Sequence, residues 1–423
     1  MLTVNYIREN KKDAIERLAV RQFDASQILD EVIGKDDIRK KTQSELDETL
    51  AQSNQLAKMI GGFYKSGEVA KAEEAKKETA QLKIKSKELS DLLSSCSQEL
   101  NELLFQIPNL PHHSVPKGKT PEDNQEISKE NEIPNLGEHS LPHWDLAAKY
   151  DLIDFELGNK ITGAGFPVYK GKGAKLQRAL INYFLDKNTE VGYKEVQVPH
   201  LVNQDSGFGT GQLPDKEGQM YYVNEDDLYL IPTAEVPITN IFRNEIVKES
   251  DFPIKYTGYT PCFRREAGSY GKDVRGLNRL HQFDKVEIVQ VESPEKSYQT
   301  LDQMVAHVTD ILRELELPFR VLKLCGGDMS FTSALTFDME VYSAAQERWL
   351  EVSSVSNFES YQANRLKLRF KDKDQKNQLC HTLNGSALAL PRIVASILEN
   401  NQHENGIKIP KVLIPYTGFD EIN

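Results

Sequence analysis

The chain has 423 residues, of which 39% are hydrophobic and 27% are charged, and its formal net charge is −12. That length exceeds what one hydrophobic core usually organises, so we expect two or three structural units in a soluble globular protein. The acidic excess argues against sequence-independent binding to DNA or anionic membranes, so any contact with nucleic acid must use a local basic face.

The cysteines and the apolar runs bear on disulfide bonds, metal binding and membrane insertion. Cys96, Cys262, Cys325 and Cys380 form no CxxC pair and have no nearby histidine at metal-ligand spacing, so we predict neither a disulfide framework nor a zinc site. Charged residues interrupt the first twenty positions, and no apolar run is long enough to span a bilayer. We therefore expect no signal peptide, no transmembrane helix and a cytoplasmic location.

The segment 28–107 has the composition of long solvent-facing helices, because it contains no proline and is rich in Lys, Glu, Gln, Ala, Leu and Ser. Two sets of residues repeat with the three-then-four spacing of a coiled-coil seam. The sets are Leu46, Leu50, Ser53, Ala57 and Ile60, and then Leu82, Leu89, Leu93, Cys96, Leu100, Leu103 and Ile107. The glycines of residues 61–67 should end the first helix and allow a reversal. The pattern predicts an antiparallel helical hairpin with its tip near residues 61–67.

Heptads taken alone are also typical of a dimerisation coiled coil. The glycine turn favours an arm, because a chain that doubles back satisfies its own seam and leaves its outer faces available for a partner. Those faces carry Lys58, Lys65, Lys71, Lys76 and Lys77. Many acidic residues accompany these lysines, so the composition permits a phosphate-binding face without requiring one.

Prolines accumulate over residues 108–145, which is typical of an ordered connection between units. Strands and helices are then expected in alternation. The predicted strands are 195–198, 228–231, 286–289 and 337–342, and the predicted helices are 174–190, 298–315 and 386–399. Because the strands lack regular helical crossovers, we predict an antiparallel sheet in an α+β domain. The predicted organisation is a helical domain over 1–107, a linker over 108–145 and an α+β domain over 146–423.

The phosphate-binding loops of the common α/β folds are missing, since there is no GxxxxGK[ST] motif. Residues 263–287 offer another arrangement, in which a strand ending in Phe263-Arg264-Arg265-Glu266 is followed by a polar loop and a second strand. An arginine can hold a phosphate, a carboxylate can accept from an adenine amino group, and a phenylalanine ring can stack on the base. Taken alone, the pattern is more typical of a surface salt-bridge ladder.

The stretch from Phe263 to Glu287 resembles motif 2 of the class II aminoacyl-tRNA synthetases. Residues 174–199 resemble motif 1, a dimer-interface helix and strand, and residues 384–392 resemble motif 3, in which a glycine-containing turn opens a helix. Four stretches resemble the bacterial-type seryl-tRNA synthetases in particular. They are Thr233-Ala234-Glu235, residues 281–287, residues 351–357 and residues 381–386. The resemblance covers nearly the whole chain and includes the amino-terminal hairpin.

This resemblance implies an enzyme that activates L-serine with ATP, giving seryl-adenylate and pyrophosphate, and then transfers the seryl group to tRNA(Ser). It implies the same transfer to tRNA(Sec), a homodimer, Mg²⁺ as the companion of ATP, and no zinc. It makes residues 146–423 a class II catalytic domain and the hairpin a tRNA-binding arm.

The resemblance also implies a role for each residue of an ATP site. Arg264 would bind the α-phosphate and the serine carboxylate, and Arg392 the γ-phosphate, which makes these two arginines the catalytic residues. Glu266 and Phe283 would hold the adenine, and Arg279 would assist at the phosphates. The implied ATP site comprises Arg264, Arg265, Glu266, Arg279, Phe283, Glu351, Val352, Ser353, Ser354 and Arg392.

Glu351 and Ser354 would supply oxygen ligands to magnesium. One departure from the family pattern is Pro391, which stands where a glycine usually precedes the motif 3 arginine. Proline is tolerated at early helical positions, so we expect a local adjustment that keeps Arg392 in place.

The implied serine site comprises Thr233, Ala234, Glu235, Arg264, Glu287, Asn384 and Ser386. Thr233 and Glu235 would receive the ammonium group of serine. Glu287 and Ser386, with Asn384 nearby, would surround its hydroxyl. Glu287 lies four residues beyond the adenine-stacking ring on one strand, so both side chains should share a face of the sheet.

Simpler readings exist for single residues. Phe283 could be an ordinary core ring, Glu351 an exposed strand end, and Thr233-Ala234-Glu235 a helix start. The agreement of six stretches in the expected chain order overturns these readings. Three alternatives remain for the whole chain: a non-catalytic synthetase-like protein, a ligase that loads an amino acid onto a carrier protein, and a coiled-coil scaffold.

Overall fold

The computed structural model describes residues 1–137, 140–266 and 275–423. They divide into two compact units, of which the first comprises residues 1–19 and 23–108 and the second residues 20–22 and 109–423. No helix among the described residues is both long enough and apolar enough to cross a membrane.

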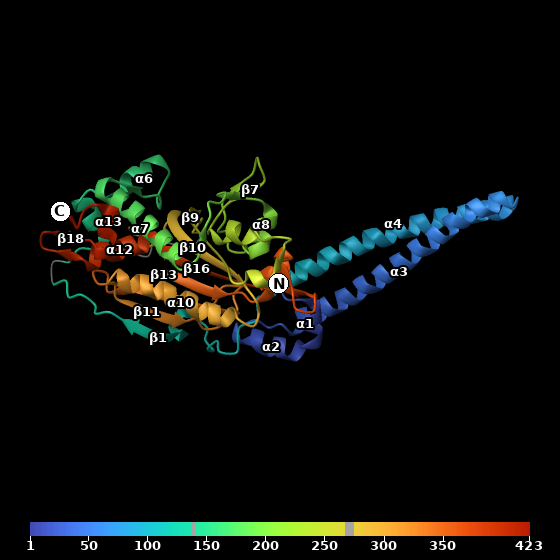
Figure 1. Cartoon of the computed structure of the whole chain (residues 1–423), viewed down its shortest axis with the longest axis horizontal. Coiled ribbons are helices and arrows are strands. Elements are labelled where there is room, and N and C mark those ends of the chain that lie inside the picture. Colours follow the sequence, from blue (N-terminus) through green and yellow to red (C-terminus); the bar gives the residue numbers. More distant parts are fainter. Residues whose placement is uncertain (138–139, 267–274) are drawn as a thin grey trace. The chain divides into compact units, whose positions relative to one another are not determined.

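The first unit is a long helical hairpin preceded by two short helices. Its helices are α1 (Val4–Glu9), α2 (Lys11–Val20), α3 (Ser26–Lys65) and α4 (Val69–Phe105). α3 and α4 lie side by side (Figure 1), and the Nζ atom of Lys35 on α3 lies 2.5 Å from a carboxylate oxygen of Glu99 on α4. The predicted antiparallel hairpin is confirmed.

The reversal lies at the carboxyl end of the stretch 61–67 in which the tip was predicted. α3 continues through Gly61 and Gly62, and the turn consists of Ser66, Gly67 and Glu68. Gly67 adopts a φ of +78°, which favours glycine, and the Ser66 amide donates to the Gly62 carbonyl at 3.0 Å. Of the glycines predicted to end the helix, only Gly67 lies in the turn. Gly61 and Gly62 lie inside α3, where the packed helix tolerates each at a cost of about 1 kcal/mol.

The seam of α3 also differs from the predicted set. Leu50 is 43% exposed and Ala57 is exposed as well, whereas the neighbouring Thr49 is buried. Thr49 can occupy the seam because its hydroxyl donates to the Glu45 carbonyl at 2.7 Å, which leaves only its methyl group to pack. A prediction based on hydrophobicity alone places Leu50 in the seam, although Thr49 occupies that position. The buried seam residues are Thr42, Leu46, Thr49 and Ser53 on α3, with Ala72, Ala75, Thr79, Leu89, Cys96, Leu100 and Leu104 on α4.

The second unit is built on an eight-stranded sheet in the order β1-β11-β12-β13-β16-β10-β9-β4. The strands are β1 (Gln125–Glu130), β11 (Phe319–Lys323), β12 (Leu335–Ser343), β13 (Arg348–Asn357), β16 (His381–Ala389), β10 (Gln282–Glu292), β9 (Ile254–Phe263) and β4 (Lys194–Glu195). Every neighbouring pair is antiparallel except β4 and β9, which are parallel. The predicted α+β class with an antiparallel sheet is confirmed. β1 comes from the segment expected to be a connection, and the strand expected over 195–198 is limited to β4.

Helices and small sheets surround this sheet. The helices are α5 (His143–Lys149), α6 (Phe155–Ile161), α7 (Gly171–Glu190), α8 (Gln204–Thr210), α9 (Glu235–Asn240), α10 (Ser297–Glu314), α11 (Ser360–Leu366), α12 (Leu390–Asn400) and α13 (Ile414–Thr417), with 3-10 turns at Pro121–Asp123, Glu249–Asp251 and Lys411–Leu413. The short strands are β2 (Ile153–Asp154), β3 (Val168–Tyr169), β5 (Leu201–Val202), β6 (Tyr222–Val223), β7 (Leu228–Leu230), β8 (Ile246–Lys248), β14 (Arg369–Lys371), β15 (Asn377–Leu379), β17 (Gln402–His403), β18 (Gly406–Lys408) and β19 (Glu421–Ile422).

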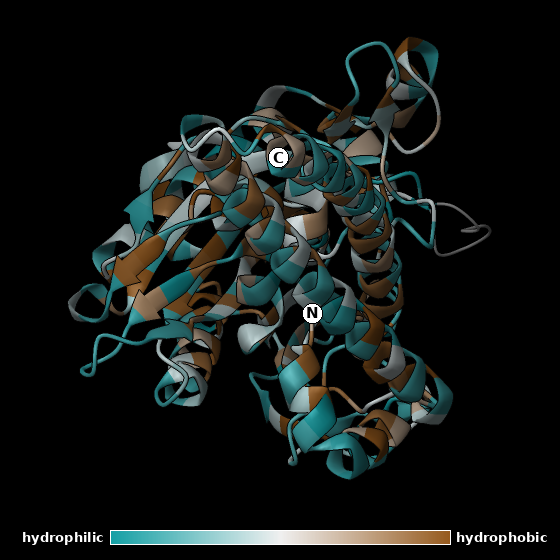
Figure 2. Ribbon diagram, turned by 90° about the vertical axis from the view of Figure 1, so that its right-hand side faces the viewer, coloured by the Kyte–Doolittle hydropathy of each residue, from teal (hydrophilic) through white to brown (hydrophobic). Residues whose placement is uncertain are grey.

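The main core lies between the large sheet and the helices α7, α10 and α12. Leu301, Met304 and Val308 recur at helical spacing on α10 and are at most 1% exposed, and Met339 and Val355 meet them from the sheet. In the ribbon coloured by hydropathy, helices and strands carry both brown hydrophobic and teal hydrophilic residues (Figure 2), as expected when an element has one buried face. Val286 and Ile288 of β10 belong to this core, so the alternate positions Lys285 and Glu287 lie on the other face of the sheet, which we call its polar face.

The helix of motif 3 begins later than predicted. Ser386 lies within β16, where it pairs with Glu287 of β10, and Ala389 pairs with Lys285. α12 starts only at Leu390. Residues 386–389 include good helix formers, but pairing with β10 overrides that propensity. The prediction that Ser386 opens the helix is therefore wrong, and it is a residue of the sheet.

Candidate active site

A cavity of about 270 Å³ opens on the polar face of the sheet where β9, β10, β13 and β16 meet the start of α12. It is lined by Arg264, Glu266, Leu277, Asn278, Arg279, Leu280, Phe283, Lys285, Glu351, Val352, Ser353, Ser386, Ala389, Pro391 and Arg392. The structure thus gathers most of the predicted ATP residues around one space. Arg265 is exposed outside this lining, and Ser354 faces a neighbouring cavity.

Arg264 follows directly after β9 and lies over the ring of Phe283 on β10. The guanidinium carbon is 5.2 Å from the ring centroid, which is a cation–π distance. The Nε atom of Arg264 donates to the Pro232 carbonyl at 3.3 Å, and its amide donates to the His281 carbonyl at 2.9 Å. These contacts hold a cation and an aromatic ring together at the floor of the cavity.

Glu266 lies three residues beyond the end of β9, and its carboxylate pairs with the guanidinium of Arg279. Residues 267–274 of the polar loop predicted here lie outside the described residues. The pair joins the two limbs of the loop at the mouth of the cavity, with the Arg279 side chain 43% exposed.

Arg392 enters the cavity from the first turn of α12. Its Nη1 atom donates to the Glu351 carbonyl at 2.6 Å, and its Nε atom donates to the Asn278 carbonyl at 3.1 Å. Pro391 occupies the first turn of α12, as expected from the tolerance of proline there. The side chain of Arg392 is therefore held between a strand and the loop.

A buried cluster of charged residues continues from the floor of the cavity. Lys285 donates to the Thr233 hydroxyl at 2.9 Å, and its Nζ atom lies 2.7 Å from a carboxylate oxygen of Glu287. The Thr233 hydroxyl donates to the same carboxylate at 3.1 Å. Burial raises the pKa of Glu287, and Lys285 opposes the shift. Burial first, and then the nearby Glu287 charge, raise the pKa of Glu235 to about 7.

Lys285 is the site residue that the sequence motifs did not reveal. It lies between Phe283 and Glu287 on β10 at alternate positions, so all three side chains share one face. That alternation was available from sequence once the strand had been placed.

The remaining residues of the predicted serine site have different environments. Ser386 lies beside Glu287 in the strand register, and its carbonyl accepts from the Ser353 hydroxyl at 2.5 Å. Asn384 is two residues along the same strand and so shares the face of Ser386. Ala234 is fully buried in a hydrophobic cluster, which makes it part of the packing that supports this region.

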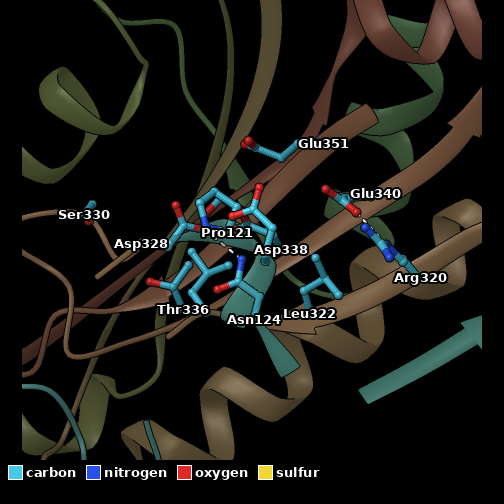
Figure 3. Close-up of a pocket in the computed structure, with 13 residues that line it drawn as sticks. Pro121, Asn124, Arg320, Leu322, Asp328, Ser330, Thr336, Asp338, Glu340 and Glu351 are labelled. Carbon is cyan, nitrogen blue, oxygen red and sulfur yellow. Dashed lines mark hydrogen bonds and ion pairs between the residues drawn. The ribbon is translucent and has the colours of Figure 1, made fainter. Parts of the chain in front are cut away.

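A second cavity of about 560 Å³ adjoins the first, and Glu351 lines both. Figure 3 shows its acidic character, with Asp328, Asp338 and Glu340 near Glu351. Asp338 lies opposite Ser354 in the register of β12 and β13. Among the described residues its Oδ1 atom has no hydrogen-bond partner. Burial, followed by the Glu351 charge, raises the pKa of Asp338 well above its usual range.

Two protein-family models match this chain. Residues 220–401 match the tRNA synthetase class II core domain (G, H, P, S and T), and residues 1–111 match the seryl-tRNA synthetase N-terminal domain. The antiparallel sheet and the cavity on its polar face therefore belong to a class II aminoacyl-tRNA synthetase.

Full-length relatives narrow the class to one family. The serine–tRNA ligase of Salinibacter ruber is 47% identical, with 100% of this chain and 99% of the relative covered. The crystal structure of seryl-tRNA synthetase from Pyrococcus horikoshii complexed with ATP matches with a TM-score of 0.88 at 34% identity. The cytoplasmic serine–tRNA ligase from Naegleria fowleri in complex with AMP matches with a TM-score of 0.86 at 27% identity. Both structural matches cover 100% of this chain and 99% of the other. The chain belongs to the seryl-tRNA synthetase family.

Family membership confirms the predicted aminoacyl-tRNA synthetase and serine–tRNA ligase. It does not favour the three alternatives of a non-catalytic relative, a carrier-protein ligase or a coiled-coil scaffold.

Proposed function

We propose that this chain forms seryl-adenylate from L-serine and ATP in the first cavity and transfers the seryl group to tRNA(Ser). The observation that carries the proposal is the arrangement of Arg264, Phe283 and Arg392 around a cavity whose floor continues into the buried cluster of Lys285 and Glu287. Relatives of matching fold were crystallised with ATP and with AMP.

The geometry supports a different role in ATP binding for each residue along the cavity. Phe283 offers a ring on which an adenine can stack, and Glu266 offers a carboxylate for its amino group. Arg264 is placed to hold the α-phosphate, and Arg392 lies farther along, where the γ-phosphate would lie if ATP bends back over the sheet. Arg279 adds a third cation at the mouth.

The reaction that this arrangement supports needs no general base. The carboxylate of serine is ionised at neutral pH, and its oxygen attacks the α-phosphorus directly while the bond to pyrophosphate breaks. Catalysis then consists of alignment and of stabilising negative charge as pyrophosphate leaves, which are the tasks of fixed arginines in a partly dehydrated site.

The residues beside the cavity fit a magnesium ion that arrives with ATP. No group of three or more His, Cys, Asp or Glu residues suited to hold a metal occurs among residues 1–137, 140–266 and 275–423. Magnesium in nucleotide sites commonly takes one or two carboxylates and completes its shell with phosphates and water. Glu351 and Ser354 would hold it, and the unpartnered oxygen of Asp338 lies across the strand register from Ser354. When bound, the ion neutralises charge on the phosphates.

We assign the buried cluster to serine. Glu235 and Thr233 would receive the ammonium group, and Glu287 and Ser386 the hydroxyl, with Asn384 beside them. The carboxylate of Glu287 is 1% exposed and already bonded to Thr233 and Lys285, so it is preorganised for one further donor.

Amino-acid-dependent exchange of pyrophosphate into ATP, run across all twenty amino acids, tests the activation step. We expect exchange with serine alone. Exchange with another amino acid but not with serine, or none at all in folded protein that binds ATP, would overturn the proposal.

The first unit is proposed to hold tRNA(Ser), and tRNA(Sec) as well. Lys58, Lys65 and Lys77 are exposed near the tip of the hairpin, whereas Lys71 and Lys76 pair with acidic neighbours. Lys58, Lys65 and Lys77 have no ion pair within the described part of the chain, so three lysines near one end suit a phosphate backbone, and binding should weaken steeply with salt.

A homodimer through residues 174–199 is also proposed, in the cytoplasm. Val191 lies within this segment and Leu201 just beyond its end, and they are 45% and 41% exposed, as apolar interface residues are in an isolated chain. Sedimentation showing a fully active monomer at assay concentration would exclude the dimer.

A further inference from the structure

The buried His143 links two parts of the molecule that shape the cavity. It is the first residue of α5 and is fully buried. Its Nε2 atom accepts from the Leu277 amide at 2.8 Å, so the ring proton is on Nδ1. Nδ1 in turn donates to the Glu399 carboxylate of α12 at 2.6 Å. The imidazole therefore connects the helix of motif 3 to residues 275–279, which we call the returning limb.

A second chain of hydrogen bonds runs parallel to the first. Gln346, in the turn between β12 and β13, donates to Glu399 at 2.8 Å and accepts from the Asn278 side chain at 2.9 Å. The Asn278 carbonyl accepts from the Nε atom of Arg392 at 3.1 Å. Glu399 thus fixes two successive residues of the returning limb, one through His143 and one through Gln346.

The fit of the returning limb against His143 is close. Gly276 adopts a φ of +65°, and a Cβ atom there would lie 2.2 Å from the Nε2 atom of His143. The guanidinium of Arg275 stacks over the Trp144 ring at 4.6 Å. The limb is therefore seated by a glycine, a stacked arginine and an amide bond to the imidazole.

The carboxylate of Glu399 is the centre of this network. Glu399 is fully buried, and its Oε1 atom accepts from the amide and the imidazole of His143 and from Gln346, while its Oε2 atom accepts from the Ser343 hydroxyl. A buried carboxylate is tolerated only when its oxygens are bonded in this way. Two of these partners lead to the returning limb, His143 to the Leu277 amide and Gln346 to the Asn278 side chain. Leu277, Asn278 and Arg279 of that limb line the cavity. The network therefore fixes the position of residues that line the first cavity.

We propose that His143 is a positioning residue for ATP: through Glu399 it locks the returning limb onto the helix that carries Arg392. The inference rests on the proposed function, because it takes the first cavity as the ATP site. His143 touches neither ATP nor serine in this account. It sets the separation between Arg279 on the limb and Arg392 on the helix, and so the fit of the polyphosphate between them.

The test uses His143→Phe in the full-length chain, which keeps a ring of similar size and removes both nitrogens. ATP affinity is measured by calorimetry without serine, and kinetic constants by serine-dependent pyrophosphate exchange. We expect ATP affinity to fall by roughly 10- to 100-fold, the scale of a buried donor left unpaired, and the KM for ATP to rise in parallel. The KM for serine, at saturating ATP, should change less than threefold. His143→Gln, which retains an acceptor for the Leu277 amide, should recover most of the ATP affinity.

A second variant and a matched control make the result decisive. Gln346→Met breaks the parallel link outside the cavity and should also raise the KM for ATP, so it carries the test if His143→Phe fails to fold. His381→Phe removes a half-buried histidine, whose ring lies 2.8 Å from the Ser297 hydroxyl at the far end of β16, and should leave ATP affinity unchanged. Folded His143→Phe and Gln346→Met proteins with wild-type ATP affinity would overturn the inference. Absence of serine-dependent exchange in the wild type would instead count against the proposed function.

Discussion

On the proposed assignment of the serine hydroxyl to Glu287 and Ser386, discrimination between serine and alanine should follow from the burial of these two residues. The two residues face each other across the register of β10 and β16, and they are 1% and 8% exposed. If both bond the serine hydroxyl, alanine leaves two buried polar groups without that partner. Each such group costs about 1–3 kcal/mol, or about 2–6 kcal/mol for both, which corresponds to a preference of roughly 30-fold to 10⁴-fold.

Replacing either residue should remove a defined part of this preference. Ser386→Ala removes one group, so the ratio of kcat/KM for serine over alanine should fall by roughly 5- to 100-fold. Glu287→Ala removes the charge that pairs with Lys285 and should cut serine-dependent exchange by orders of magnitude while ATP affinity changes little. Threonine keeps the hydroxyl and adds a methyl, so it is excluded by volume, and an enlarged site should admit it first.

Pyrophosphate exchange with serine, alanine and threonine measures all three effects. Glu292→Gln is the matched control, because Glu292 is also 1% exposed on β10 but bonds to Thr300 away from the cavity. It should leave the serine preference intact. Full serine activation by Glu287→Ala with undiminished rejection of alanine would refute the hydroxyl assignment and make this carboxylate structural.

Four further outcomes are expected. Arg392→Ala should lower kcat for exchange by about 10²-fold, the scale for losing a group that stabilises developing charge, with circular dichroism unchanged. The pKa of Glu235 is raised to about 7. If serine binding needs the ionised form of this carboxyl, kcat/KM for serine should rise about tenfold from pH 6 to pH 8, and Glu235→Gln should lose this rise. Glu351→Gln should increase the Mg²⁺ concentration for half-maximal exchange by about tenfold. Deleting residues 46–89 and closing the gap with a short turn should preserve exchange and abolish aminoacylation, because it removes only the proposed tRNA-binding arm. The shortened hairpin can keep its register, since the cut ends are equidistant from the turn, as are the paired Lys35 and Glu99. Equal loss of both activities in folded protein would refute a separate arm.

Periodicity and motif order were sufficient to predict the large features of the fold. The three-then-four repeat led to the hairpin, and alternating runs led to the antiparallel sheet. Errors arose where tertiary contacts override local preference. Thr49 takes the seam from Leu50 because its hydroxyl is satisfied within the helix, and Ser386 joins β16 because β10 offers it a register.

Some residues of the site could be predicted from sequence motifs, and others could be found only in the structure. Residues such as Arg264 and Arg392 stand in recognisable stretches, and the cavity gathers both. Lys285 belongs to such a stretch but carries no signal of its own until the strand alternation is applied. His143 and Glu399 are 256 residues apart in the chain and joined only in space, so no local pattern can indicate that they act on one loop.

The charges of the site explain how a chain with a net charge of −12 can take an anionic nucleotide and a cationic amino group in adjacent spaces. Arg264, Arg279 and Arg392 line the cavity proposed for ATP, whereas the carboxyls of Glu235 and Glu287 lie buried behind it. Burial raises the pKa of both carboxyls, so in the free enzyme part of the Glu235 population is protonated near neutral pH. An incoming ammonium group favours the ionised form and lowers that pKa again. Serine binding should therefore release protons near pH 7, and calorimetry in buffers of different ionisation enthalpy would detect that release. Alanine carries the same ammonium group, so its proton release at saturation should be equal even though its affinity is lower, which separates the recognition of the amino group from that of the hydroxyl.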